Sequence, residues 1–334
     1  MPMRKIYAIT VAAALCLCSC SDNNYTFVDS FPISGELQPV RTMKYDPVKV
    51  NLYGIARAGD YWIAYIGDND YRAAVTDDSL NVIVRTLRTG NGPGEFLYPL
   101  RYGTPYTEGD SVIIFVKDAF KGSLNRVATC LTDGKTDVRK IGEVPVMNRT
   151  WHPLPDGSVI VSNNENRYFL ISSDSDTVYF ETWGDDIDAK EYEDWWIPRL
   201  QTSEIFTPDN SKMLVYTDRP YVWLHSTDGR LIRKVYVEQR PDEVRENAGG
   251  LGFNDGDLLG NHFLLLFNDL VDEETWTCST RLMVFDFDMR PEAVYSIEGD
   301  VSSFYADPET GLIYINDRDE ELIRIYDLSE WLRS

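Results

Sequence analysis

The chain contains 334 residues, of which 54 are acidic and 32 are basic, giving a formal net charge of −22 at pH 7. A field of this sign repels nucleic acid and anionic lipid head groups, so the composition argues against both as binding partners. Hydrophobic residues make up 43% of the chain and aromatic residues 13%, which is enough to bury a large core.

The first twenty residues have the pattern of an export signal. Arg4 and Lys5 form a short basic region, and residues 6–17 follow without a charge. This stretch is too short to cross a bilayer as a helix, but it has the length of the apolar part of a secretory signal. It ends in Leu17-Cys18-Ser19-Cys20, which resembles the lipobox of bacterial lipoproteins. We therefore predict that residues 1–19 are a lipoprotein signal peptide.

The lipobox resemblance implies that Cys20 carries fatty acyl chains, palmitate among them, and anchors the protein to a membrane. Residues 20–35 are then interpreted as a polar tether. In the sorting rules of bacterial lipoproteins, an aspartate directly after the acylated cysteine retains the protein at the inner membrane. Ser21 occupies that position here, which favours an outer-membrane lipoprotein of the cell envelope, facing the periplasm or the cell surface.

The remainder of the chain repeats with a period of about 50 residues. Residues that enter the left-handed backbone conformation at low cost recur 48 to 53 residues apart, and each precedes a short apolar strand. These residues are Gly59, Gly109, Gly157, Asn210, Gly260 and Gly311. A second series of turns lies out of phase with the first, at Asp77, Asp133, Asp174, Asp228, Asp288 and Asp327.

Two turns per repeat predict four short strands per repeat. Six such repeats predict an all-β fold, a six-bladed β-propeller of four-stranded antiparallel blades spanning residues 36–334. The sixth repeat lacks its fourth strand and ends in a segment, residues 328–334, that resembles a short helix. Residues 36–43 at the other end of the domain could supply that strand and close the ring.

One linker supports a family resemblance. Residues 90–99, Gly-Asn-Gly-Pro-Gly-Glu-Phe-Leu-Tyr-Pro, resemble the linker between blades in NHL-type propellers, and the segment lacks the Gly-Lys-Ser/Thr ending of a phosphate-binding loop. The chain after Cys20 is similar to the TolB-like six-bladed propeller lipoproteins of Gram-negative bacteria. That resemblance implies the fold and an envelope location, but no particular activity.

A third series of polar residues is expected between the second and third strands of the blades. Because these loops share one face of a propeller, the residues could ring the central opening and bind Ca²⁺, another cation, a sugar or a peptide amine. The alternative is that each side chain caps its own turn. This acidic ladder consists of Asp68, Asp118, Asn164, Asp218, Asp269 and Asp317.

An acidic, aromatic insertion, residues 183–203, separates the third and fourth repeats. Trp183, Tyr192, Trp195 and Trp196 could stack on a sugar or a cationic peptide. The alternative is a short solvated helix whose tryptophans pack on the propeller.

No catalytic signature is visible: the chain has no Gly-x-Ser-x-Gly elbow, and its three histidines fall in different repeats without metal spacing. We therefore expect a non-enzymatic interaction module, anchored to a membrane, that binds a protein, peptide or glycan at the acidic mouth of the ring. The alternative is a calcium-dependent hydrolase or lactonase acting at the same mouth, because Asn268-Asp269 and Asn316-Asp317 resemble ligand pairs of calcium-dependent lactonases. No cofactor is expected, apart from Ca²⁺ in that alternative.

Overall fold

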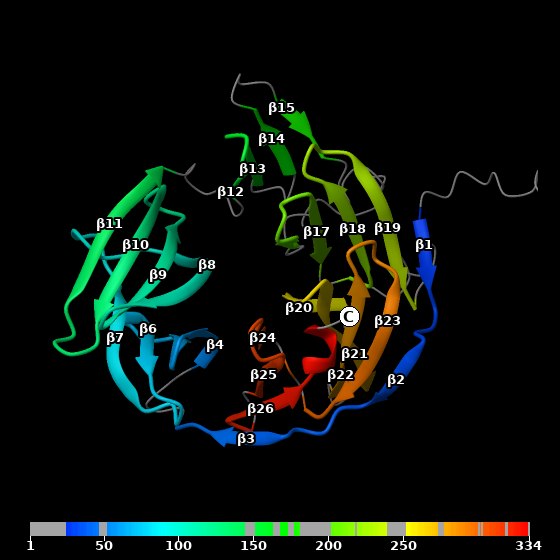
Figure 1. Cartoon of the computed structure of the whole chain (residues 1–334), viewed down its shortest axis with the longest axis horizontal. Coiled ribbons are helices and arrows are strands. Elements are labelled where there is room, and N and C mark those ends of the chain that lie inside the picture. Colours follow the sequence, from blue (N-terminus) through cyan, green and yellow to red (C-terminus); the bar gives the residue numbers. More distant parts are fainter. Residues whose placement is uncertain are drawn as a thin grey trace, which may run out of the picture.

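Six antiparallel sheets, which we call blades 1 to 6, surround a common axis in the computed structural model (Figure 1). The structure describes residues 25–46, 52–143, 151–162, 168–172, 177–180, 202–217, 219–238, 252–272, 277–299, 301, 303–317 and 320–332. The six sheets around one axis confirm the predicted six-bladed propeller. Among these residues, none forms a helix with the length and apolar character needed to cross a membrane.

Blades 1 to 3 each contain four strands, which follow one another in the chain from the axis outward. Blade 1 contains β4 (Leu52–Ala58), β5 (Tyr61–Ile66), β6 (Tyr71–Thr76) and β7 (Val82–Arg88). Blade 2 contains β8 (Pro99–Glu108), β9 (Ser111–Asp118), β10 (Ser123–Cys130) and β11 (Thr136–Glu143). Blade 3 contains β12 (Trp151–Pro153), β13 (Val159–Ser162), β14 (Tyr168–Ile171) and β15 (Thr177–Tyr179).

Blades 4 to 6 have the same plan but also include N-terminal strands. Blade 4 contains β16 (Thr202–Phe206), β17 (Lys212–Thr217), β18 (Tyr221–Ser226), β19 (Leu231–Val237) and β1 (Tyr25–Val28). Blade 5 contains β20 (Gly252–Leu259), β21 (His262–Asp272), β22 (Thr277–Asp286), β23 (Pro291–Ile297) and β2 (Ile33–Glu36). Blade 6 contains β24 (Ser303–Ala306), β25 (Leu312–Asp317), β26 (Leu322–Asp327) and β3 (Arg41–Lys44).

The turn between the first and second strands has the same backbone conformation in every blade. All six residues of the first predicted series have a positive φ, between 56° and 85°. Only Gly and Asn enter this region at low cost, which explains why the sequence repeats these residues there. The period seen in the sequence is therefore the period of the blades.

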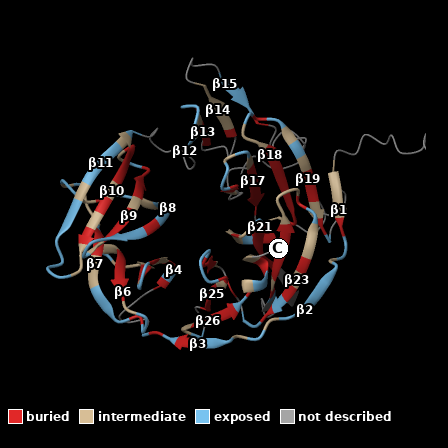
Figure 2. Cartoon of the chain, in the orientation of Figure 1, coloured by how far each residue is buried: buried red, intermediate tan, exposed pale blue. Residues whose placement is uncertain are grey.

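The hydrophobic core lies between the blades. In the described part of the chain, each of five clusters of buried side chains joins two neighbouring blades. Middle strands such as β9 and β18 are buried on both faces, whereas the outer strand β11 is largely exposed and β7 is exposed at three of its seven residues (Figure 2). A middle strand therefore needs apolar residues on both faces, as in the sequence Tyr61–Ile66.

The N-terminal segment closes the ring and also extends beyond it. β3 pairs antiparallel with β26, with Met43 opposite Ile323, so the predicted closing strand is present. The preceding residues differ from the prediction, because β1 pairs parallel with β19 of blade 4 and β2 pairs parallel with β23 of blade 5. Residues 25–28 and 33–36 are thus strands on the outer edges of blades 4 and 5 (Figure 1), and not part of a tether.

Met43 provides a test of ring closure, because it is 9% exposed in the cluster shared by blades 6 and 1. We expect Met43→Ala to lower the free energy of unfolding in urea by about 2–3 kcal/mol. Ile33 on β2 is 48% exposed, so Ile33→Ala is the matched control and should change the free energy by less than about 0.5 kcal/mol. Equal effects of the two substitutions would contradict a closing role for β3.

The C-terminal segment forms a short 3-10 helix, Ser329–Leu332, as the sequence indicated. Trp331 is buried in the cluster shared by blades 5 and 6. A Cβ atom on Gly260 would lie 2.5 Å from the Trp331 carbonyl oxygen, so the turn between β20 and β21 leaves no room for a side chain beneath this helix.

Candidate functional site

The acidic ladder is only partly within the described residues. Asp68, Asp118 and Asp317 are described, and all three follow or end the second strand of their blades. Asn164 and Asp218 lie outside the described residues. Asp269 lies within β21, where only its backbone is described.

Asp118 holds together two segments of the backbone. Its buried carboxylate accepts hydrogen bonds from the backbone N–H groups of Phe120 and Lys121, at 3.1 and 3.2 Å, in its own loop. It also accepts bonds from Leu97 and Tyr98, at 2.8 and 3.3 Å, in the linker from blade 1. Asp118 therefore fastens the linker to blade 2, a structural role.

Asp317 and Asp68 are also engaged within the fold. Asp317 is buried, pairs with the Arg324 guanidinium and accepts the Glu320 N–H at 3.1 Å. Asp68 is more exposed; it pairs with Arg85 at 2.5 Å and accepts the Asp70 N–H at 2.9 Å. Each of the three described carboxylates accepts a backbone N–H group of its own loop, as the turn-capping alternative describes, and ligand binding at the ladder stays a prediction.

The asparagines next to the ladder join adjacent blades. The Asn316 side chain donates to the Leu52 carbonyl of blade 1 at 3.2 Å, and the Asn268 side chain donates to the Val301 carbonyl at 3.2 Å. In the described ranges, no three His, Cys, Asp or Glu side chains are placed to hold a metal ion. Calcium binding stays a prediction. The predicted stacking residues Trp183, Tyr192, Trp195 and Trp196 lie outside the described residues.

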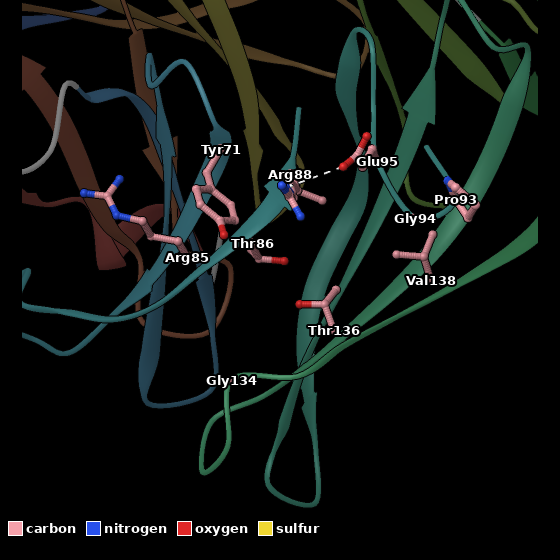
Figure 3. Close-up of a pocket in the computed structure, with 11 residues that line it drawn as sticks. Tyr71, Arg85, Thr86, Arg88, Pro93, Gly94, Glu95, Gly134, Thr136 and Val138 are labelled. Atoms are coloured by element: carbon pink, nitrogen blue, oxygen red, sulfur yellow. Dashed lines mark ion pairs between the residues drawn. The ribbon is translucent and has the colours of Figure 1, made fainter. Parts of the chain in front are cut away.

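The glycine-rich linker borders a groove between blades 1 and 2 with a volume of about 320 Å³ (Figure 3). β7 and β11 form its walls, and the hydroxyls of Thr86 and Thr129 meet between the blades at 2.7 Å. Arg88, two-thirds exposed, pairs with Glu95 at 3.5 Å. This groove is open, and its lining includes Arg85, Arg88 and Glu95.

The linker is held by a charge of its own and by a charge of blade 2. The Glu95 carboxylate accepts the Gly92 N–H at 2.8 Å, and the Lys121 ammonium donates to the Glu95 carbonyl at 2.6 Å. Phe96 is buried in the cluster between blades 1 and 2. The segment is therefore a connection between blades, as predicted.

A second group of polar and charged side chains lies on the innermost strands, except that Tyr65 lies on β5, the second strand of blade 1. These strands contact one another around the axis, β8 with β4, β4 with β24, and β24 with β20. The group, which we call the axial cluster, combines side chains from blades 1, 2, 5 and 6 that interact electrostatically: Tyr65, Arg101, Asp255, Asp257 and Tyr305.

The two carboxylates of the axial cluster bind the backbone of the next blade. Asp255 accepts the Phe304 N–H at 2.9 Å, and Asp257 accepts the Ala306 N–H at 3.0 Å. Both N–H groups belong to β24, the innermost strand of blade 6, whose free edge would otherwise be unpaired. Burial raises the pKa of Asp255 to about 7 and also raises the pKa of Asp257, against the hydrogen bonds and the Arg101 charge.

Arg101 faces these carboxylates from the opposite side of the ring. Blade 2 lies across the axis from blade 5 (Figure 1), and the Arg101 charge acts on both carboxylates. Desolvation by itself would lower the pKa of Arg101. The electrostatic effects of Tyr65, Asp257 and Asp255 outweigh it, so the pKa is raised. Even so, Arg101 forms no ion pair or hydrogen bond within the described part of the chain.

Tyr65 adds an unused hydrogen-bonding group. Its hydroxyl is buried and has no hydrogen-bond partner among the described residues. Burial raises the pKa of Tyr65 to about 12, and the Arg101 charge opposes that rise. The Tyr65 hydroxyl is enclosed, so it is not available to a ligand from solvent. The exposed Arg101 guanidinium and the remaining lone pairs of the two carboxylates suit a ligand that both donates and accepts hydrogen bonds.

The sequence reasoning missed the axial cluster. Its visible signal is Asp255-Gly256-Asp257 at the start of a repeat, because side chains two positions apart lie on one face of a strand. Arg101 carries no comparable local signal. Its proximity to the carboxylates follows from the opposition of blades 2 and 5.

No protein family matches the chain, and neither does any curated protein. Among solved structures, it is similar to the β-propeller domain of Cps50 (Swd1) from Myceliophteria thermophila, with 10% identity, coverage of 87% of this chain and 99% of that chain, and a TM-score of 0.43. It is also similar to BamB from Moraxella catarrhalis, with 9% identity, coverage of 87% and 100%, and a TM-score of 0.37. Likenesses at this level carry no information about ligand or activity.

Proposed function

We propose that this protein is a lipid-anchored propeller of the bacterial envelope that binds a polar ligand at the axial cluster without transforming it. The ligand is a protein loop, a peptide or a glycan. The observation that carries the proposal is that the Arg101 charge acts on Asp255 and Asp257, although among the described residues Arg101 forms no ion pair with either carboxylate. A guanidinium and two carboxyl groups that do not pair with one another leave donors and acceptors free for a ligand.

The chemistry of the axial cluster suits recognition better than catalysis. Asp255 and Asp257 are each held by two backbone N–H groups, since they also accept from Gly256 and Leu258 at 2.9 Å. A carboxylate fixed in this way is a rigid acceptor. Lipid on Cys20 completes the proposal, because the lipobox predicts that the ring is held at a membrane.

Thermal unfolding in the presence of a panel of oligosaccharides and short peptides tests the proposal. We expect a compound that binds the axial cluster to raise Tm by several degrees at saturating concentration. Arg101→Ala and Asp257→Asn should each abolish the rise. A compound that stabilises the wild-type protein and both variants equally would contradict the proposed site.

A further inference from the structure

We propose that the outer edge of blade 4 is the part of the ring nearest the membrane, and that blades 1 and 2 point away from the bilayer. The inference rests on the lipid anchor of the proposed function. It adds an interaction surface, with the lipid head groups as its partner, and an orientation for the whole molecule.

The chain between the lipid and the first strand is short. Cys20 and Tyr25 are five positions apart, 25 − 20 = 5. Five residues span at most about 17 Å, even when fully extended. Tyr25 therefore stays within about 17 Å of an acylated Cys20, whatever conformation the intervening residues adopt.

β1 holds Tyr25 on blade 4. β1 pairs with β19 from Tyr25 opposite Lys234 to Val28 opposite Val237. Val28 is 3% exposed in the cluster shared by blades 4 and 5, and its carbonyl accepts the Glu238 N–H at 2.9 Å. The short tether thus ends on a packed edge strand.

The direction of β1 adds a further restriction. Because β1 is parallel to β19, the chain enters blade 4 from the side of the turn between β18 and β19, residues 227–230. That turn is on the face opposite the linkers between blades. The linker face, which carries Asp118 and Asp317, is accordingly the face turned away from the point of anchoring.

The charge of blade 4 is compatible with this position. The blade 4 segment, residues 202–238, contains five Lys or Arg and five Asp or Glu residues, so its net charge is 5 − 5 = 0, whereas the whole chain has −22. A segment without net charge can approach anionic head groups without repulsion. The blade 2 segment, residues 99–143, contains seven Lys or Arg and six Asp or Glu residues, 7 − 6 = +1, so charge permits the proposed orientation and the short tether sets it. Blades 1 and 2 lie across the ring from blades 4 and 5 (Figure 1), so the groove of Figure 3 faces away from the bilayer.

Energy transfer to the membrane surface tests this orientation. The mature lipoprotein, with Cys130→Ser and Cys278→Ser, is labelled with a donor dye at Ile232→Cys on blade 4 or at Ile141→Cys on blade 2. These residues are 39% and 46% exposed, respectively. In vesicles of phosphatidylethanolamine and phosphatidylglycerol with acceptor-labelled head groups, we expect at least about twofold higher transfer from position 232. Equal transfer, or higher transfer from position 141, would overturn the inference.

Two controls separate this inference from the proposed anchor. Mass spectrometry of the N-terminal peptide shows whether Cys20 is acylated; an unmodified Cys20 would contradict the anchor and with it the orientation. A variant with twenty Gly and Ser residues inserted between Asn24 and Tyr25 should lose the difference between the two positions. If the lipidated protein keeps the difference with this long tether, the tether does not set the orientation and the argument from its length is wrong.

Discussion

Asp118→Ala is expected to lower the free energy of unfolding by about 3–5 kcal/mol, the range seen when a buried, hydrogen-bonded charge is removed from its partners. The substitution leaves four backbone N–H groups without their acceptor, at Leu97, Tyr98, Phe120 and Lys121. Urea unfolding followed by circular dichroism measures the change. Asp118→Asn should fall between the alanine variant and the wild-type protein, because the amide keeps one acceptor oxygen.

Asp68 is the matched control, because it occupies the corresponding loop one blade earlier. Its pair with Arg85 is formed by side chains that are 31% and 35% exposed, and pairs of this kind contribute about 0–1 kcal/mol. Asp68→Ala should therefore cost about 1 kcal/mol or less. If the two alanine variants lose the same stability, the linker is not fastened by Asp118 as the structure indicates.

Asp255→Asn is expected to change the pH dependence of stability. Burial raises the pKa of Asp255 to about 7 in the folded protein, from 3.8 in the unfolded chain. The folded state therefore holds a proton that the unfolded state releases, and the contribution of this group to stability is lost as pH rises from about 4 to about 7. The full difference is of the order of 4 kcal/mol at most, at about 1.4 kcal/mol per pH unit.

The measurement is the difference in unfolding free energy between Asp255→Asn and the wild-type protein at several pH values between 4.5 and 8. The difference should move in favour of Asn as pH rises, because the amide never ionises. Asp209→Asn is the control, since hydrogen bonds from Thr207 and Ser211 lower the pKa of Asp209 to about 2, and its effect should be constant over this range. If the difference for Asp255→Asn is also constant, the pKa of Asp255 is not raised into the neutral range.

The blade architecture could be predicted because each blade needs particular residue types at its turns. Gly59, Asn210 and the other members of the first turn series all need a positive φ, and this requirement returns once per blade. The closing strand could be predicted because blade 6 lacked a partner for β26. The Asp ladder was also visible, but composition alone did not separate a ligand site from a structural cap. The structure shows that Asp118 acts as a cap, because its carboxylate accepts the backbone N–H groups of the linker from the neighbouring blade.

The parallel strands β1 and β2 could not be predicted from their own residues. Ser34 and Gly35 of β2 are exposed and show no apolar alternation, so the strand exists because β23 offers a free edge. The axial cluster is non-local in the same sense. Arg101 and Asp255 are separated by half the ring, and only closure of the ring of blades places their strands around one axis.

The most direct test of the axial cluster is calorimetric titration of the most stabilising ligand from the thermal panel into three proteins. These are the wild-type protein, Arg101→Ala at the axis and Arg88→Ala in the groove between blades 1 and 2. Loss of a charged hydrogen bond is worth about 1.5–3 kcal/mol, so Arg101→Ala should weaken binding by roughly 10- to 100-fold while Arg88→Ala leaves it within about twofold. A ligand that loses affinity in Arg88→Ala and keeps it in Arg101→Ala would place the binding site in the groove and contradict the proposed function.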